Sequence, residues 1–218
     1  LYGSDLKDVW HQYYGNANYT LPMTDTQSVN FDFNIYRTTD AGAAKAGDIN
    51  NTTWSLAAAY SFLTAHTITL AYQKVHGDTP FDYVAFGNNG AGDTGDSIFL
   101  ANSIQYSDFN GPGEKSWQAR YDLNMASYGV PGLSFMVHYV NGDDIDGSHL
   151  PSNSTYGGYG DDGKHHETNL EAKYVVQSGP AKDLSLRMRQ AWHTANGDQP
   201  DGDAKEFRLI ADYPINVF

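Results

Sequence analysis

The sequence predicts an all-β fold, a set of antiparallel transmembrane strands that form part of a larger β-barrel. Segments in which apolar and polar residues alternate recur along the chain, and a period of two is typical of β-strands. The connections between these segments alternate between long and short, as they do in outer-membrane barrels. The polar faces carry charges of both signs, which a dry core accepts only in pairs but a water-filled interior solvates.

Four segments in the first part of the chain alternate in this way. Each places apolar side chains at every second position, opposite polar residues such as Asn30, Asp32 and Asn34. We therefore expect a strand with one apolar and one polar face at each place. The segments are 7–21 with Val9, Tyr13, Tyr19 and Leu21, 28–37 with Val29, Phe31, Phe33 and Ile35, 52–62 with Trp54, Leu56, Ala58 and Tyr60, and 66–76 with Ile68, Leu70 and Tyr72.

Five further segments follow, which makes nine. In 207–218 the odd positions are apolar and the even positions include Arg208, Asp212 and Asn216, so the face of this strand that carries the arginine is expected to contact water. The others are 117–125 with Trp117, Tyr121 and Leu123, 133–139 with Leu133, Phe135 and Val137, 167–176 with Leu170, Ala172 and Tyr174, and 184–193 with Leu186, Met188 and Trp192.

The lengths of the connections support a barrel. Connections 38–51, 77–115, 142–165 and 195–204 are long, whereas 22–27, 63–65, 127–131 and 178–182 are short. A soluble β-sandwich has no reason to sort its loops by parity. Nine strands are too few to enclose a wide pore, and an odd antiparallel set leaves both edges open. We therefore expect this chain to be part of a larger barrel, beginning within a structural element.

Composition excludes several classes of protein. Acidic residues outnumber basic ones 26 to 13, which argues against non-specific binding to nucleic acid. The chain has no cysteine, hence no disulfide and no thiolate metal site. Ser97 invites a hydrolase interpretation, but the sequence contains no Gly-x-Ser-x-Gly motif. We expect no enzymatic activity and no cofactor.

Two features invite a metal-site interpretation. The acidic runs at 143–146 and 198–203 do not have EF-hand spacing, so solvated external loops are expected there, with a lipopolysaccharide-bridging divalent ion left open. His165 and His166 are neighbours on one strand and point to opposite faces, so they cannot chelate an ion together. No metal site is predicted.

Four stretches carry a resemblance to a known family. The run 95–117, Tyr128–Leu133, Gly163–Tyr174 and the Asp-Tyr-Pro sequence at 212–214 resemble the OprD family, the substrate-specific porins of pseudomonads. The resemblance implies a monomeric or loosely trimeric barrel of eighteen strands in outer-membrane lipid and lipopolysaccharide. Residues 1–218 would be the C-terminal half of this single domain, strands ten to eighteen, and the N-terminal half would be their partner. Val217 and Phe218 resemble the outer-membrane assembly signal.

The resemblance also implies site residues. The segment 77–115 matches a long loop folded into the pore, and Asp96, Ser97 and Asp108 fall where the family places the constriction, or eyelet. A basic ladder on the barrel wall matches the following residues, all on the face expected to be wet: Lys173, Arg187, Arg189 and Arg208. The next rung falls at Ile210, which is apolar, and this departure weakens the lower end of the ladder. Arg120 and Asp122 are expected to form an ion pair on the pore wall.

These features together predict a substrate-selective outer-membrane channel. It would pass small carboxylate-containing nutrients, amino acids or aromatic acids, passively into the periplasm, because a row of cations offers a carboxylate successive weak sites. The carboxylate and the selectivity follow from the resemblance, and which acid is preferred stays open. The alternative is an outer-membrane-associated or soluble β-sandwich binding module without transport.

Overall fold

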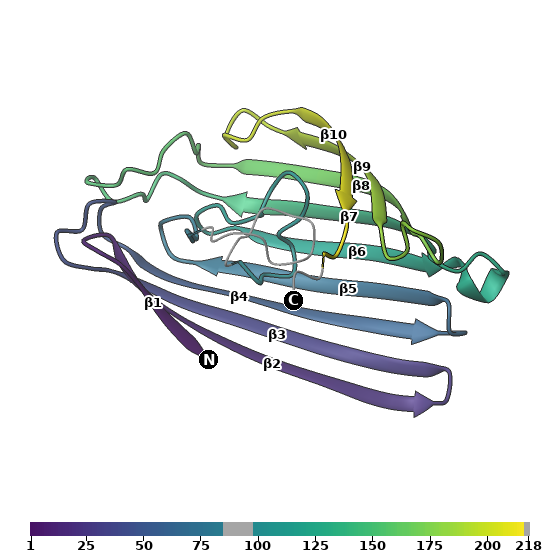
Figure 1. Cartoon of the computed structure of the whole chain (residues 1–218). Helices are drawn as coiled ribbons and strands as arrows, with labels where there is room; N and C mark the ends of the chain where they lie inside the picture. The colour runs from purple at the N-terminus through teal and green to yellow at the C-terminus, as the bar shows by residue number, and fades with distance from the viewer. Residues whose placement is uncertain (85–97, 216–218) are drawn as a thin grey trace.

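The computed structural model describes residues 1–84 and 98–215, and they form a single antiparallel sheet. Ten strands follow one another in sequence order, each hydrogen-bonded to the next (Figure 1). The strands are β1 (Tyr2–Leu6), β2 (Trp10–Thr24), β3 (Gln27–Asp40), β4 (Asn50–Phe62), β5 (His66–His76), β6 (Lys115–Asn124), β7 (Leu133–Ile145), β8 (Gly163–Val175), β9 (Ser185–Ala195) and β10 (Ala204–Asp212), with a short 3-10 helix, η1 (Met125–Tyr128), between β6 and β7.

The prediction of nine strands is one short, because β1 lies before the first predicted segment. This strand has only five residues, with Tyr2 and Leu6 on one face and Gly3 and Asp5 on the other, so it is too short for periodicity to reveal it. It pairs with β2 from Tyr2 opposite Tyr14 to Leu6 opposite Trp10. The segment predicted at 7–21 accordingly begins with a turn and becomes a strand only at Trp10.

The last predicted strand, 207–218, is displaced toward the N-terminus. β10 begins at Ala204 and ends at Asp212, two residues before Pro214. Proline has no N–H to donate to a neighbouring strand, which agrees with an end at this place. Val217 and Phe218 lie outside the described residues.

The connections lie at two ends of the sheet. Segments 25–26, 63–65, 125–132 and 176–184 join strands at one end, on the right in Figure 1, and 41–49, 77–114 and 146–162 join them at the other. The sequence predicted long connections at one end of the sheet and short ones at the other. This prediction fails for the first and last connections at the end expected to carry the long ones. There, 7–9 is as short as a turn, and 196–203 is no longer than 176–184.

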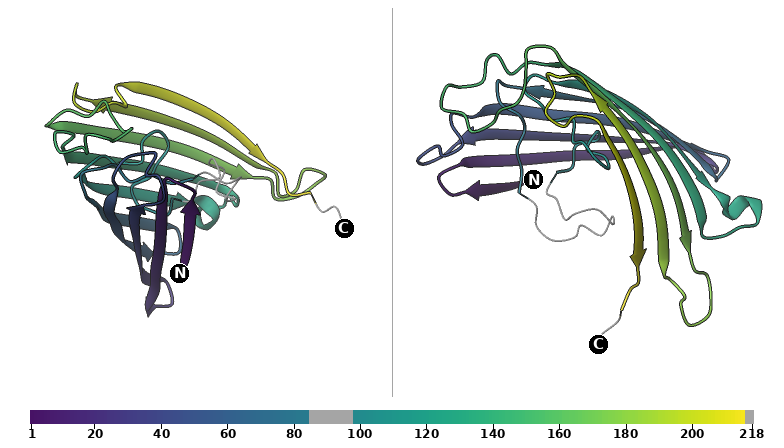
Figure 2. Two further views of the ribbon diagram at one scale, coloured as in Figure 1. Left: turned by 90° about the vertical axis from the view of Figure 1, so that its left-hand side faces the viewer. Right: turned by 90° about the horizontal axis from the view of Figure 1, so that it is seen from above.

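The sheet is curved into an open trough, and the described parts of the connection 77–114, residues 77–84 and 98–114, lie inside it (Figure 2). Polar side chains of the inner face hold the backbone of this connection. Gln73 Nε2 donates to the carbonyl oxygens of Asp108 and Phe109 at 3.0 and 2.8 Å. Asn51 Nδ2 donates to Thr79 O at 2.8 Å, and Ala101 N donates to Ser55 Oγ at 3.0 Å. The polar face thus satisfies backbone groups that the connection itself leaves unpaired.

The outer face of the sheet is apolar and exposed. Leu70 is 59% exposed and Met188 54%, whereas Asn169 and Glu167 on the inner face are fully buried. This is the reverse of a soluble β-sandwich, which hides its apolar faces. Large apolar side chains exposed on the outer faces of the strands include Tyr13, Tyr19, Leu21, Phe31, Leu56, Ile68, Leu70, Trp117, Phe135, Val137, Leu170, Leu186, Met188, Trp192, Phe207 and Leu209.

Aromatic side chains gather near both ends of this outer face. Toward the long connections, Trp54 lies 5.6 Å from Tyr72 and Trp117 lies 5.5 Å from Tyr139, measured between ring centroids. Tyr60 lies six positions after Trp54 on β4, which at about 3.3 Å per residue separates the two levels by about 20 Å. Two aromatic levels that flank an apolar band are the pattern of a barrel in a bilayer. Among residues 1–84 and 98–215, no helix is long and apolar enough to cross a membrane.

Candidate functional site

The predicted ladder residues lie on the polar face of β8, β9 and β10. The register places Arg187 between Lys173 and Ile210, and Arg189 between Glu171 and Arg208. The four predicted cations therefore occupy two adjacent rows across three strands. Ile210 takes the place of a cation in the row nearer the short turns, as the sequence analysis anticipated.

Glu171 is the counter-ion of two of these arginines. Its Oε2 atom lies 2.8 Å from Arg187 Nη2 and 3.0 Å from Arg189 Nε. The side chains of all three residues are only 9 to 12% exposed. This role of Glu171 could not be predicted from the sequence, because the pairing depends on the register of β8 against β9.

The other two cations lie in more open surroundings. Arg208 Nη2 is 2.9 Å from Glu206 Oε2 and donates to Gln105 O at 2.8 Å, so it joins β10 to the connection 77–114. Lys173 is partly exposed, and within the described ranges the structure gives it no ion pair. Lys173 and Arg208 are therefore more accessible than the two arginines beside Glu171.

A polar cleft of about 420 Å³ lies between residues 101–104 of the connection and the wall of the sheet. Arg120 and Asp122 lie in it as a bidentate pair, with Nε donating to Oδ2 at 2.7 Å and Nη2 to Oδ1 at 2.6 Å. This is the ion pair predicted for the wall, and its fork geometry is the strong form of an arginine–carboxylate contact. The cleft is lined by Thr67, Thr69, Ala101, Ser103, Ile104, Gln118, Arg120, Asp122, His138 and Arg189.

Asp108 lies on the connection itself and is held at both carboxylate oxygens. Ser103 Oγ donates to Oδ1 at 2.5 Å, and Tyr83 Oη donates to Oδ2 at 2.6 Å. Of the three predicted eyelet residues, Asp108 is thus fixed in place beside Ser103, which lines the cleft. Asp96 and Ser97 lie outside the described residues.

Two buried carboxylates fasten the connection to the wall. Glu167 of β8 accepts from the backbone N–H groups of Tyr106 and Ser107 at 3.0 and 2.9 Å. Glu114 closes the turn at the end of the connection, where its Oε2 accepts from Gly111 N at 2.7 Å. Burial raises the pKa of the Glu114 carboxyl, and the neighbouring His165 partly offsets the rise. Sequence reasoning missed both anchors because the contacts that reach across the trough join distant residues: Glu167 to the connection, and Glu114 Oε1 to His165 Nε2 of β8 at 2.8 Å.

Comparison with known proteins agrees with this geometry. Residues 1–217 match a family model described as outer membrane porin, OprD family. Porin D of Pseudomonas aeruginosa is 72% identical over 221 residues, which cover 100% of this chain and 49% of Porin D. The porin-like protein GalP of Pseudomonas putida is 30% identical, over 98% of this chain and 46% of GalP. The chain therefore spans about half the length of these relatives.

Solved structures match with the same coverage. A crystal structure of Pseudomonas aeruginosa OprD has a TM-score of 0.90 at 70% identity, over 99% of this chain and 56% of that one. OccD3 (OpdP) of the same organism has a TM-score of 0.87 at 43% identity, over 99% of this chain and 52% of that one. The family consists of substrate-specific channels rather than enzymes. The chain belongs to the OprD family of bacterial outer-membrane porins, and its ten strands are about half of an eighteen-stranded barrel.

Proposed function

We propose that the complete protein passes small carboxylate-bearing nutrients, such as amino acids or aromatic acids, passively through the outer membrane. The observation that carries this proposal is the charge of two adjacent rows of side chains on the wall formed by β8, β9 and β10. These rows contain Lys173, Arg187, Arg189 and Arg208 but a single carboxylate, Glu171, while Glu206 pairs with Arg208 from the next row. A small anion is attracted to such rows, and cations on adjacent strands offer it successive weak sites.

Arginine suits this role for a chemical reason. Its planar guanidinium can meet a carboxylate with two parallel hydrogen bonds, and it stays charged at any working pH. Glu171 weakens each site, because it already accepts from Arg187 and lies within ion-pair distance of Arg189. We infer that this competition keeps the affinity low enough for the substrate to leave, which conduction requires.

The segment 77–115 supplies the opposite side of the proposed constriction. We assign Asp108, Asp96 and Ser97 to this eyelet, where acidic and hydroxyl groups would hold the positive end of an amino acid or reject other anions. Arg120 and Asp122 would line the wall as a neutral pair. The barrel would be completed by the remaining half of the protein, in contact with outer-membrane lipid and lipopolysaccharide, as a monomer or a loose trimer.

The test is conductance of the complete protein in a planar bilayer, titrated with a panel of small carboxylates. We expect carboxylates to reduce the ion current, and Arg187→Ala and Arg189→Ala to weaken that block. Lys205→Ala is the matched control, because this exposed lysine lies on β10 with the opposite parity to Arg208. Equal block in all variants would refute the ladder, and folded protein that carries no current would refute the channel.

A further inference from the structure

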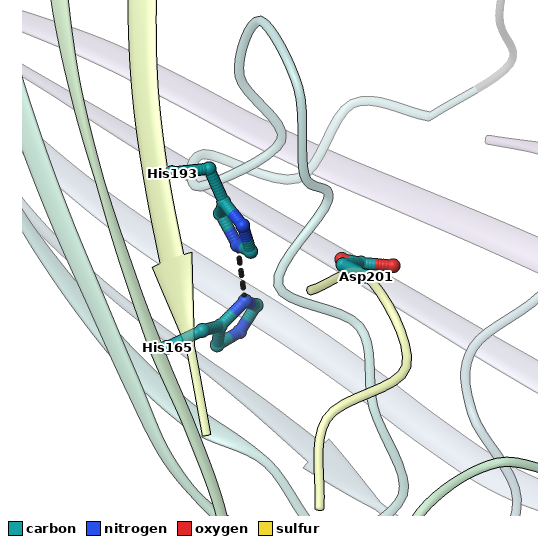
Figure 3. Close-up of side chains that lie close together, drawn as sticks. All are labelled: His165, His193 and Asp201. Carbon is teal, nitrogen blue, oxygen red and sulfur yellow. Dashed lines mark hydrogen bonds between the residues drawn. The ribbon is translucent and has the colours of Figure 1, made fainter. Parts of the chain in front are cut away.

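Two buried histidines meet where β8 and β9 approach the connection 196–203. His165 Nδ1 lies 2.9 Å from His193 Nε2, and both residues are 2% exposed (Figure 3). His166, the other histidine of the pair in the sequence, lies on the opposite face of β8, as expected. The partner of His165 comes instead from the neighbouring strand.

Each imidazole also contacts an acceptor with its outer nitrogen. His165 Nε2 lies 2.8 Å from Glu114 Oε1, and His193 Nδ1 lies 2.7 Å from Gly202 O. The row Glu114–His165–His193–Gly202 therefore contains three short contacts, and each needs one hydrogen. Two neutral imidazoles supply two hydrogens. When both are donated outward, two bare nitrogens face each other, and Gln199 Nε2 lies 3.2 Å from one of them, His165 Nδ1. Either an additional proton in the row or a bound cation between the rings would complete the three contacts.

A third ligand group lies beside these nitrogens. A carboxylate oxygen of Asp201, the His165 nitrogen and the His193 nitrogen all lie within 4.8 Å of one another. Zinc bonds of about 2.0 to 2.2 Å place tetrahedral ligands about 3.3 to 3.6 Å apart. Around an ion the two imidazole nitrogens, now 2.9 Å apart, would separate slightly and the Asp201 carboxylate would move closer to them. The side-chain amide of Gln199, now 3.2 Å from His165 Nδ1 and 3.3 Å from Asp201 Oδ2, would move aside. Asp201 is exposed, which provides an entry route and leaves a fourth position for water.

We propose that His165 Nδ1, His193 Nε2 and the Asp201 carboxylate bind a divalent transition-metal ion of the zinc class. The ion replaces the extra hydrogen that the row otherwise needs. Two imidazoles and one carboxylate are ligands that zinc accepts. Glu114 and Gly202 are then the outer partners that orient the two rings, a common feature of histidine metal sites.

Metal binding at this place would also tighten the connection 77–114. Ser107 Oγ of that connection donates to Asp201 Oδ2 at 2.8 Å, and Glu114 ends the same connection. An ion held by Asp201 and the two histidines would therefore join the connection to the wall of β8 and β9. This inference does not depend on which solute the channel passes.

The test uses the full-length protein in detergent, without a histidine tag, stripped with a chelator and titrated with ZnCl₂ by calorimetry. We expect one zinc ion per chain at this site, and at least hundredfold weaker binding in His193→Ala. Glu114→Gln should weaken binding about 10- to 100-fold, as loss of a ring-orienting partner does. Binding should be unchanged in His166→Ala, the matched control on the opposite face.

Asp201→Asn covers the case in which His193→Ala does not fold, because Asp201 is an exposed loop residue. We expect weaker zinc binding in this variant and a changed visible spectrum when Co²⁺ is the probe. Absence of zinc binding in the unaltered protein would overturn the proposal and leave a shared proton between the rings. Equal binding in folded His193→Ala or in Asp201→Asn would overturn it as well.

Discussion

Neutralising Glu171 should strengthen the interaction of the channel with carboxylates. In Glu171→Gln, the amide keeps a hydrogen-bond acceptor near Arg187 and Arg189, but the negative charge now 2.8 and 3.0 Å from these arginines is lost. A substrate carboxylate about 5 Å away would escape a repulsion of about 0.8 kcal/mol in water. This corresponds to about fourfold tighter binding, and lower polarity in the cleft would enlarge the effect.

The assay is carboxylate block of single-channel current, together with the reversal potential in a salt gradient. At about 0.01 M salt, where the screening length is about 30 Å, the carboxylate block should become stronger and the reversal potential should shift toward greater anion selectivity. Both changes should shrink at about 1 M salt. Asp25→Asn, in the short turn 25–26, removes one negative charge away from the ladder rows and should change neither. Unchanged or weaker carboxylate block in folded Glu171→Gln would refute the electrostatic reasoning.

Two further substitutions test the loop anchor and the membrane face. Glu167→Ala removes the acceptor of two backbone N–H groups and of Asn169 Nδ2 at 2.7 Å. The connection 77–114 should therefore become more sensitive to protease, and the open-channel current should become noisier. An unchanged digestion rate would contradict this anchoring. Leu70→Arg places a charge on the exposed apolar face and should cost about 2 to 4 kcal/mol of folding stability in a bilayer. Thr69→Arg, one residue earlier and facing the cleft, should cost much less, and equal losses measured by urea titration in lipid vesicles would reverse our assignment of the faces.

The faces of the strands could be predicted because β periodicity is local. Asn30, Asp32 and Asn34 alternate with apolar neighbours, and any strand through them must separate the two kinds of side chain. The same logic correctly placed Arg187, Arg189 and Arg208 on one face. It failed for Tyr2–Leu6, where five residues are too few to show a period, and at the C-terminal end, where β10 stops before a proline.

The contacts that organise the site could not be predicted, because they depend on register and on the path of the connection 77–114. Glu171 lies beside Arg189 only because β8 and β9 pair in one particular register. Glu114 and His165 are far apart in sequence, yet they lie 2.8 Å from each other. A single sequence contains no signal that identifies such partners. It shows only that a charged residue lies on the polar face of a strand and therefore needs a partner or water.

The facing of β10 provides the most direct test of a water-filled pore. The chain has no cysteine, so Arg208→Cys and Leu209→Cys each introduce a single thiol into this half of the barrel. A membrane-impermeant, charged thiol reagent should change the single-channel current at position 208 and leave it unchanged at position 209, where the side chain faces lipid. Modification of the current at position 209 alone, or at neither position in folded protein, would contradict the account.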